Sequence, residues 1–226
     1  MKKKIEDLCP QLTNEEMRGL VYGRWSAPSN AGVTIINYTF DRIDELEKIV
    51  LKDYSGAVIS SLVDETRKKV EQALDVWRSA CGKMIQFNYV PKFDISQRGI
   101  IFIGCDNLDS AHGVTYPKLN GFEFEQVMVC IPSIIKSPYD IKALYHELGH
   151  ALGLEHMQDV ESVKQAIMNG KQGLGYSVMI YNKIVQTDVN HCETAEYCDD
   201  QHYGLRTGPM DKQVCSALYP KLSPSL

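Results

Sequence analysis

Three of the chain's six histidines fall within one short segment, HELGHALGLEH, from His146 to His156. His146 and His150 are four residues apart, so on a helix they lie one turn apart on the same face and can reach one metal ion. His156 cannot lie on that face, but a break at Gly153 would let the chain turn back toward the metal. Three nitrogen ligands leave a fourth position open, which is the arrangement of a catalytic Zn²⁺ site.

Glu147 directly follows the first candidate ligand. From there a carboxylate can reach a water at the metal without binding the metal itself. Zinc lowers the pKa of water toward roughly 7 and polarises a carbonyl, and Glu147 would take the proton and pass it to a leaving amine. The alternative without a metal site is a helix that carries histidines on one face by chance. The added Gly153 and His156 make the whole pattern far more specific than HExxH alone.

The helix that must carry these residues has a clear start. Ser137 can cap it, Pro138 suits its first turn, and Asp140 completes a capping-box pattern. Gly153 supplies the flexible residue that ends it. An apolar stripe at helical spacing fits the same span: Ile141, Leu144, Leu148, Ala151 and Leu152.

The other expected elements follow from periodicity and from β-branched or aromatic runs. In order, they are a strand at 32–40, a long amphipathic helix at 57–80 ended by Gly82, strands at 84–90, 99–104 and 126–132, and a short helix around Met210, Val214 and Leu218. No repeat or linker divides the chain. The pattern predicts one α/β (α+β) domain.

Composition narrows the function classes. With 226 residues, of which 44% are hydrophobic, the chain can bury a sizeable core. A formal net charge of −5 disfavours a nucleic-acid binder. No apolar run is long enough for a membrane span, and no apolar region follows Lys2–Lys4 as in a secretory signal. Export would therefore need another route or a leader already removed.

The cysteines and acidic residues bear on two further features, possible disulfides and a possible Ca²⁺ site. Cys192 and Cys198 bracket a polar loop, where a local disulfide and a plain surface loop stay open as alternatives. Four other cysteines stand beside apolar residues and are expected to be buried free thiols: Cys9, Cys81, Cys105 and Cys130. The oxygen-bearing residues Asp106, Asn107 and Asp109 are candidate Ca²⁺ ligands, although an ordinary polar loop is the favoured alternative.

The motif HExxHxxGxxH resembles the signature of metzincin zinc peptidases, which also carry a methionine turn downstream. The segment GYSVMIYN places Met179 beyond the third histidine and Tyr181 two residues later. This Ser-x-Met-x-Tyr pattern resembles serralysins and astacins. The resemblance implies that Met179 packs beneath the metal and that Tyr181 stabilises the oxyanion. An ordinary core methionine is the alternative for Met179.

The resemblance covers most of the chain, through WSAPSNAGVTIINYTF, VEQALDVWRSACGKMIQF and GPMDKQVCSALY, which are similar to serralysin and matrixin segments. It implies a zincin-like metzincin fold: a twisted mixed five-stranded sheet, a long helix, an active-site helix, and a smaller C-terminal subdomain with the methionine turn and a last helix. The implied division is an N-terminal extension at 1–24, a peptidase domain at 25–220 with subdomains 25–156 and 157–220, and a tail at 221–226.

The resemblance also carries the functional expectation of a zinc-dependent endopeptidase. The implied partner is a protein or peptide substrate, extended along 126–132 as an edge strand. Met157 matches neither the proline usual in serralysins nor the serine usual in matrixins at that place, so the subfamily stays open. The sequence does not indicate an oligomeric state. One alternative is a zinc-bound, non-hydrolytic peptide-binding domain, against which the intact Glu147 argues. Another is a secreted toxin or effector protease with one narrow target.

Overall fold

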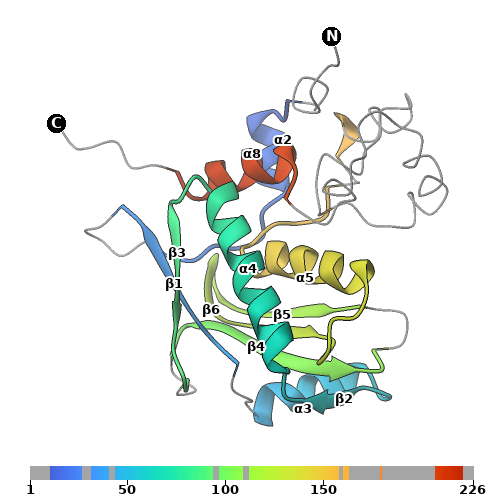
Figure 1. The fold of residues 1–226 in the computed structure, drawn as a ribbon. Coiled ribbons are helices and arrows are strands. Elements are labelled where there is room, and N and C mark those ends of the chain that lie inside the picture. Colours follow the sequence, from blue (N-terminus) through green and yellow to red (C-terminus); the bar gives the residue numbers. More distant parts are fainter. Residues whose placement is uncertain are drawn as a thin grey trace.

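The computed structural model describes residues 11–26, 32–40, 44–93, 97–108, 112–157, 160–162, 179 and 207–220. Helices and strands alternate through most of this range, which confirms the α/β class (Figure 1). The elements are α2 (Asn14–Gly19), β1 (Thr34–Thr39), α3 (Asp44–Asp53), β2 (Val58–Ser60), α4 (Asp64–Ala80), β3 (Ile85–Tyr89), β4 (Gly99–Asp106), β5 (Val114–Asn120), β6 (Glu123–Ile131), α5 (Pro138–Ala151) and α8 (Pro209–Leu218).

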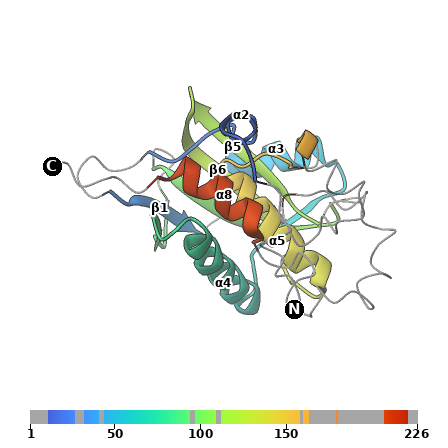
Figure 2. The same cartoon turned by 90° about the horizontal axis from the view of Figure 1, so that it is seen from above.

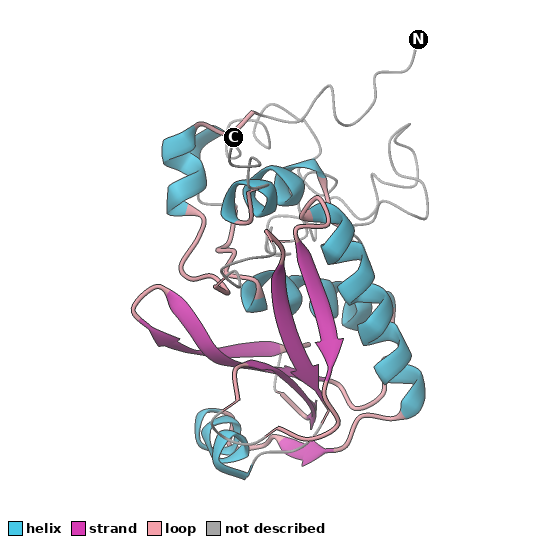
Figure 3. Ribbon diagram, turned by 90° about the vertical axis from the view of Figure 1, so that its left-hand side faces the viewer, coloured by secondary structure: helices cyan, strands magenta, loops and turns pink. Residues whose placement is uncertain are grey.

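The strands form one mixed sheet in the order β3-β1-β4-β6-β5, with β2 paired to β4 off this path. Strands β3, β1, β4 and β6 are parallel, whereas β2 and β5 run antiparallel to their neighbours. The sheet therefore has six strands where five were expected. Figure 3 shows them as one twisted layer with a long helix beside it.

Burial on β4 shows how the sheet divides the core. Ile100 and Phe102 face the main cluster beneath α4 and α5, whereas Ile101 and Ile103 face a smaller cluster on the side of α3. Because successive side chains of a strand point to opposite faces, a strand covered on both sides reads as a continuous apolar run. Trp77 of α4 is fully buried in the main cluster, and its indole N–H donates to the carbonyl of Tyr145 in α5 at 3.0 Å.

Four elements are absent from the sequence-based prediction. The helix expected at 57–80 begins only at Asp64, because Val58–Ser60 pairs with β4 as strand β2. Helices α2 and α3 and strand β5 were also missed. Pro117 lies within β5, and a proline in a sequence argues against a strand unless that strand lies at an edge.

Of the two edges of the sheet, formed by β3 and β5, the one beside α5 is β5, so the expectation that 126–132 forms the edge is wrong. Strand β6 lies between β4 and β5, so both of its sides are paired. A tight turn at Gly121, whose φ is +63°, folds the chain back and places β5 outside β6. The strand directly before the active-site helix is thus interior, and its hairpin partner is exposed at the edge.

Two disulfides correct the prediction of free thiols. Cys81 is bonded to Cys215 and Cys105 to Cys130, with Cα atoms 4.9 and 5.5 Å apart. The first bond joins the end of α4 to α8, and Figure 2 shows these two helices side by side. Its partners are 134 residues apart, so no local pattern could have revealed the pairing. The three remaining cysteines lie outside the described residues: Cys9, Cys192 and Cys198.

The residues before β1 pack against the domain. Helix α2 starts with a capping box between Thr13 and Glu16, and Leu20 and Trp25 are buried in the main cluster. The division of the chain at residue 25 stays a prediction. Among the residues the structure describes, no helix is long and apolar enough to cross a membrane.

Replacing both Cys81 and Cys215 by alanine is expected to lower the free energy of unfolding by roughly 4–5 kcal/mol. The disulfide restricts the conformations of the unfolded chain, and this effect grows with the length of the loop that the bond closes. Urea denaturation measures the change. The matched control replaces Cys105 and Cys130, whose bond closes a loop of only 25 residues and should contribute less. Equal losses in the two variants, or no loss in the first, would contradict this expectation.

Candidate metal centre

Helix α5 begins and ends as the sequence predicts. The backbone N–H of Asp140 donates to the Ser137 hydroxyl at 3.2 Å, and the Asp140 carboxylate accepts from the Ser137 N–H at 2.9 Å. The helix ends at Ala151, and Gly153 follows with a φ of +100°. A positive φ is open to glycine at little cost, so this residue permits the sharp turn.

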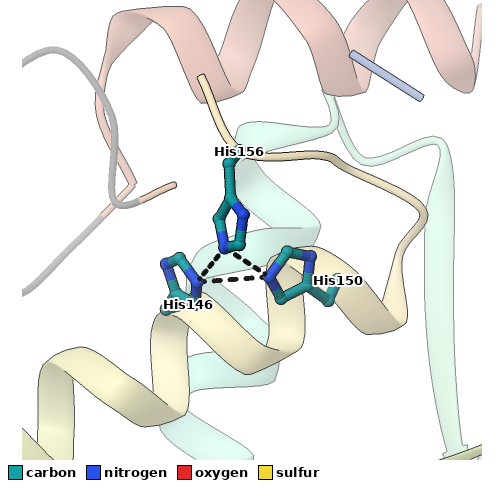
Figure 4. A group of neighbouring side chains, drawn as sticks. All are labelled: His146, His150 and His156. Atoms are coloured by element: carbon teal, nitrogen blue, oxygen red, sulfur yellow. Dashed lines mark hydrogen bonds between the residues drawn. The ribbon is translucent and has the colours of Figure 1, made fainter. Parts of the chain in front are cut away.

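The turn brings the three predicted ligands to one point. The Nε2 atoms of His146 and His156 lie 3.0 Å apart, and the Nε2 atom of His150 lies 3.2 Å from the first and 3.1 Å from the second. Figure 4 shows two rings rising from α5 and the third descending from the segment after it. Among the described residues, these three histidines are the only group that could hold a metal ion.

This triangle fits Zn²⁺. Tetrahedral zinc with nitrogen ligands at about 2.0–2.1 Å holds those nitrogens roughly 3.3 Å apart, close to the spacing seen here. His150 Nδ1 lies 2.8 Å from the Leu154 carbonyl, which assigns the proton to Nδ1 and leaves the Nε2 lone pair facing the centre. Burial, together with repulsion from His156, lowers the pKa of His150 to about 4, so this ring is neutral at pH 7. Neutral imidazole is the form that binds metal.

Glu147 is held beside this triangle by the edge strand. Its side chain is buried, and its carboxylate accepts a hydrogen bond from the Thr115 hydroxyl of β5 at 2.7 Å. The chain approaches closely at Gly113, where an added Cβ would lie 2.8 Å from Glu147 Cγ. Burial raises the pKa of Glu147 to about 7, while the Thr115 hydrogen bond acts in the opposite direction. A carboxyl in this range can both accept and return a proton near neutral pH.

Sequence reasoning missed Gly113 and Thr115 because it missed strand β5. A signal was present in the run GVTY, which is β-branched and aromatic and begins after a polar loop. Even with the strand recognised, the side chain facing Glu147 depends on the pairing register, in which Thr115 lies opposite Val129. A one-residue shift would point Thr115 to the other face of the sheet.

Met179 lies against the active-site helix between the ligands. It is fully buried, and a Cβ added at Gly149 would lie 2.2 Å from its sulfur. Its carbonyl accepts from the N–H of Met157, the residue after the third histidine, at 3.1 Å. Its role stays a prediction. Three other predicted site residues lie outside the described residues: Tyr181, Cys192 and Cys198.

The candidate calcium loop receives no support. The Asp106 carboxylate accepts hydrogen bonds from the hydroxyls of Ser133 at 2.7 Å and Ser60 at 3.1 Å, and from the Ser133 N–H at 3.1 Å. Asn107 has a φ of +59° and serves a turn, while Asp109 lies outside the described residues. Asp106 thus joins β4 to the segment after β6.

Comparisons with known proteins return structural likenesses alone. No family model matches the chain, and no curated protein matches it. Among solved structures, it is similar to high choriolytic enzyme 1, a hatching enzyme zinc-protease from Oryzias latipes (medaka fish), at 17% identity and a TM-score of 0.47, covering 93% of this chain and 98% of that one. It is also similar to myroilysin, at 16% identity and a TM-score of 0.45, covering 91% and 100%. Likenesses this distant carry no argument about function, which rests on the site itself.

Gly153→Ala is expected to destabilise the protein by more than the roughly 1–2 kcal/mol of an ordinary left-handed residue, because its Cβ would lie 1.9 Å from the Gly23 carbonyl oxygen. It should also weaken zinc binding by displacing His156. The matched control is Gly121→Ala, which shares a positive φ but meets nothing within 4 Å. Urea unfolding and zinc titration compare the two. Similar stability losses with unchanged zinc affinity would refute the steric role.

Proposed function

We propose that this chain is a zinc-dependent endopeptidase of the metzincin type. The observation that carries the proposal is the meeting of three imidazole nitrogens within 3.2 Å of one another, on and just after a helix that also presents a buried carboxyl group. Three nitrogen ligands with an open fourth position fit a catalytic site better than a structural one. The HExxHxxGxxH resemblance agrees with this interpretation.

The proposed reaction is hydrolysis of a peptide bond. When bound by His146, His150 and His156, zinc supplies Lewis-acid chemistry, which acidifies water and polarises a carbonyl. Glu147 accepts a proton from the water that attacks the carbonyl carbon. The same carboxyl then delivers this proton to the amide nitrogen as the C–N bond breaks. The products are a carboxylic acid and an amine, and the second proton of the water passes from the acid to the amine to give a carboxylate and an ammonium group.

The environment of Glu147 supports both halves of this proton transfer. Burial raises its pKa to about 7, so both the protonated and the ionised forms are populated near neutral pH. The Thr115 hydroxyl holds one carboxylate oxygen at 2.7 Å and also contacts the Glu147 carbonyl at 3.0 Å. A carboxylate fixed at one oxygen leaves the other to face the substrate side.

We propose β5 as the strand that receives the substrate. Among the residues that the structure describes, β5 pairs with β6 alone and forms the edge of the sheet beside α5, and Thr115, which contacts the proposed base, belongs to it. An extended peptide can add to such an edge through backbone hydrogen bonds, which give affinity with little sequence preference. Strand addition next to Glu147 would bring the backbone of a peptide substrate to the centre.

Two further roles are proposed from the family resemblance. Met179 would serve as the methionine beneath the metal, and its packing against Gly149 is consistent with this position. Tyr181 would donate to the oxyanion. Release into an oxidising compartment is also proposed, because structural disulfides such as Cys81–Cys215 form and persist there.

The proposal is tested with Glu147→Gln, which removes the proton acceptor but leaves the three histidines in place. Cleavage of an unfolded protein mixture should fall by at least about 10²-fold, while the zinc content per molecule stays unchanged. The matched control is Glu65→Gln, a substitution on the exposed face of α4. This variant should cleave the mixture at the rate of the unmodified protein. A chelator should stop the unmodified protein.

Two results would count against an endopeptidase. If Glu147→Gln cleaves at the unmodified rate, Glu147 is not the base. If the unmodified protein holds one zinc ion yet cuts neither the mixture nor a proteome-derived peptide library, the non-hydrolytic binding domain becomes the better account. Where cutting is seen, the spread of cleavage sites distinguishes a general protease from one with a narrow target.

Thr115→Val is expected to lower kcat by about 10- to 100-fold, because a hydrogen bond to a charged group is worth roughly 1.5–3 kcal/mol. Thr115→Ser keeps the hydroxyl and should restore most of the rate. Steady-state kinetics at equal zinc content separate kcat from KM. Equal rates for the valine and serine variants would show that the Thr115 hydroxyl does not support Glu147.

A further inference from the structure

The end of α5 leaves backbone carbonyls that the helix cannot satisfy internally. Their partners come from elsewhere in the chain. The Ala151 carbonyl accepts from the indole N–H of Trp25 at 2.9 Å, and the Leu152 carbonyl accepts from the Tyr219 hydroxyl at 2.9 Å. The segment that carries the third histidine is therefore held from outside the helix.

Most of these partners belong to residues 20–25, here called the N-terminal strap. The Tyr22 hydroxyl donates to the backbone carbonyl of His150, whose imidazole is a proposed metal ligand. The Tyr22 N–H donates to the Gly153 carbonyl at 3.0 Å. The Leu20 carbonyl accepts from the N–H of Glu155 at 2.7 Å. Glu155 directly precedes His156, so the strap binds both sides of the turn between the second and third ligands.

The strap is anchored on its other side to the sheet. The Arg24 N–H donates to the Phe122 carbonyl at 3.0 Å, and the Phe124 N–H donates to the Arg24 carbonyl at 2.9 Å. Gly23 lies so close that an added Cβ would be 2.6 Å from Leu119 and 2.8 Å from Phe124. The strap thus connects the β5–β6 hairpin to the turn after α5.

We propose that the N-terminal strap positions the third histidine of the metal centre, with Tyr22 as the positioning residue. Its hydroxyl holds the backbone of His150, its ring lies 6.4 Å from the His150 ring, and its N–H holds Gly153. The inference rests on the zinc site of the proposed function but not on proteolysis. It assigns a role in the metal centre to residues that lie before the predicted peptidase domain boundary at residue 25.

The strap matters because a turn of this kind is not self-supporting. Among the hydrogen bonds of the turn itself, the Gly153 N–H donates to the His150 carbonyl at 2.8 Å and the Leu154 N–H to the Gly149 carbonyl at 3.0 Å. Neither bond reaches residue 155 or 156. The bond from Glu155 to Leu20 supports the chain just before His156, and the bond from the Met157 N–H to the Met179 carbonyl supports it just after. Loosening the strap therefore removes one of the two backbone hydrogen bonds that flank this ligand.

The test measures zinc binding in the full chain by competition with a chromophoric chelator at pH 7.5. Tyr22→Phe removes the hydroxyl that contacts His150, and we expect zinc affinity to fall by about 10- to 100-fold, as for other groups that orient metal ligands. Trp25→Phe removes the donor to Ala151 and should weaken binding in the same direction. This second variant keeps the test valid if Tyr22→Phe does not fold. The matched control is Tyr38→Phe, a buried tyrosine on β1.

A second measurement distinguishes a strap that positions the metal ligands from a strap that only stabilises the fold. Substituting Co²⁺ for zinc gives an absorption spectrum that depends on the number and geometry of nitrogen ligands. Tyr22→Phe should shift this spectrum toward that of His156→Ala, which has lost the third ligand. If the strap only stabilised the fold, Tyr22→Phe would destabilise the metal-free and metal-loaded forms equally. The zinc affinity and the Co²⁺ spectrum would then stay unchanged.

The outcomes are distinguishable. Zinc affinity and Co²⁺ spectra of both strap variants within about twofold of the control would overturn the positioning role while leaving the zinc site intact. Failure of the unmodified protein to bind either metal would overturn the zinc site and the inference together. Weakened binding with an altered spectrum supports the inference, whether or not any variant cuts a peptide.

Discussion

The proposed metal centre depends on one geometric constraint, the reversal of the chain directly after α5. Two histidines one turn apart face one point by virtue of helix geometry alone. The third must return to the same point within six residues of the second, which requires the positive φ of Gly153 and the close passage of Gly23. Without that reversal, the helix would present two imidazoles and a carboxyl group but no three-ligand site.

The parts of the centre come from elements far apart in the sequence, and the packing between them is what makes the site. Helix α5 supplies two histidines and Glu147, the edge strand supplies Thr115, and Met179 fills the space against Gly149. Trp77 holds α5 to α4 through the Tyr145 carbonyl. The carboxyl group is thereby buried enough for its pKa to rise, while the open side of β5 stays available.

Local chemistry explains which features the sequence could predict. The capping box at Ser137, the break at Gly153 and the convergence of the three histidines depend on spacing within one short segment, and the structure confirms all three. The disulfide partners of Cys81 and Cys105 depend on pairing between residues 134 and 25 positions apart. Strand β5 pairs with the next strand, β6, across a tight turn, and it was missed because Pro117 argues against a strand. The direction of the Thr115 side chain depends on the register of this pairing. The helix boundary at Asp64 was misjudged because apolar periodicity continued through the short strand β2.

Pro117 on the edge strand has a consequence for how copies of this protein meet one another. A strand open to an extended peptide is equally open to the same strand of a second molecule, and sheet edges of this kind promote aggregation. Proline has no N–H to offer, and the neighbouring Lys118 adds an exposed charge. Both residue types blunt edge-to-edge pairing. The same strand can therefore remain accessible to a peptide while discouraging self-association of the folded protein.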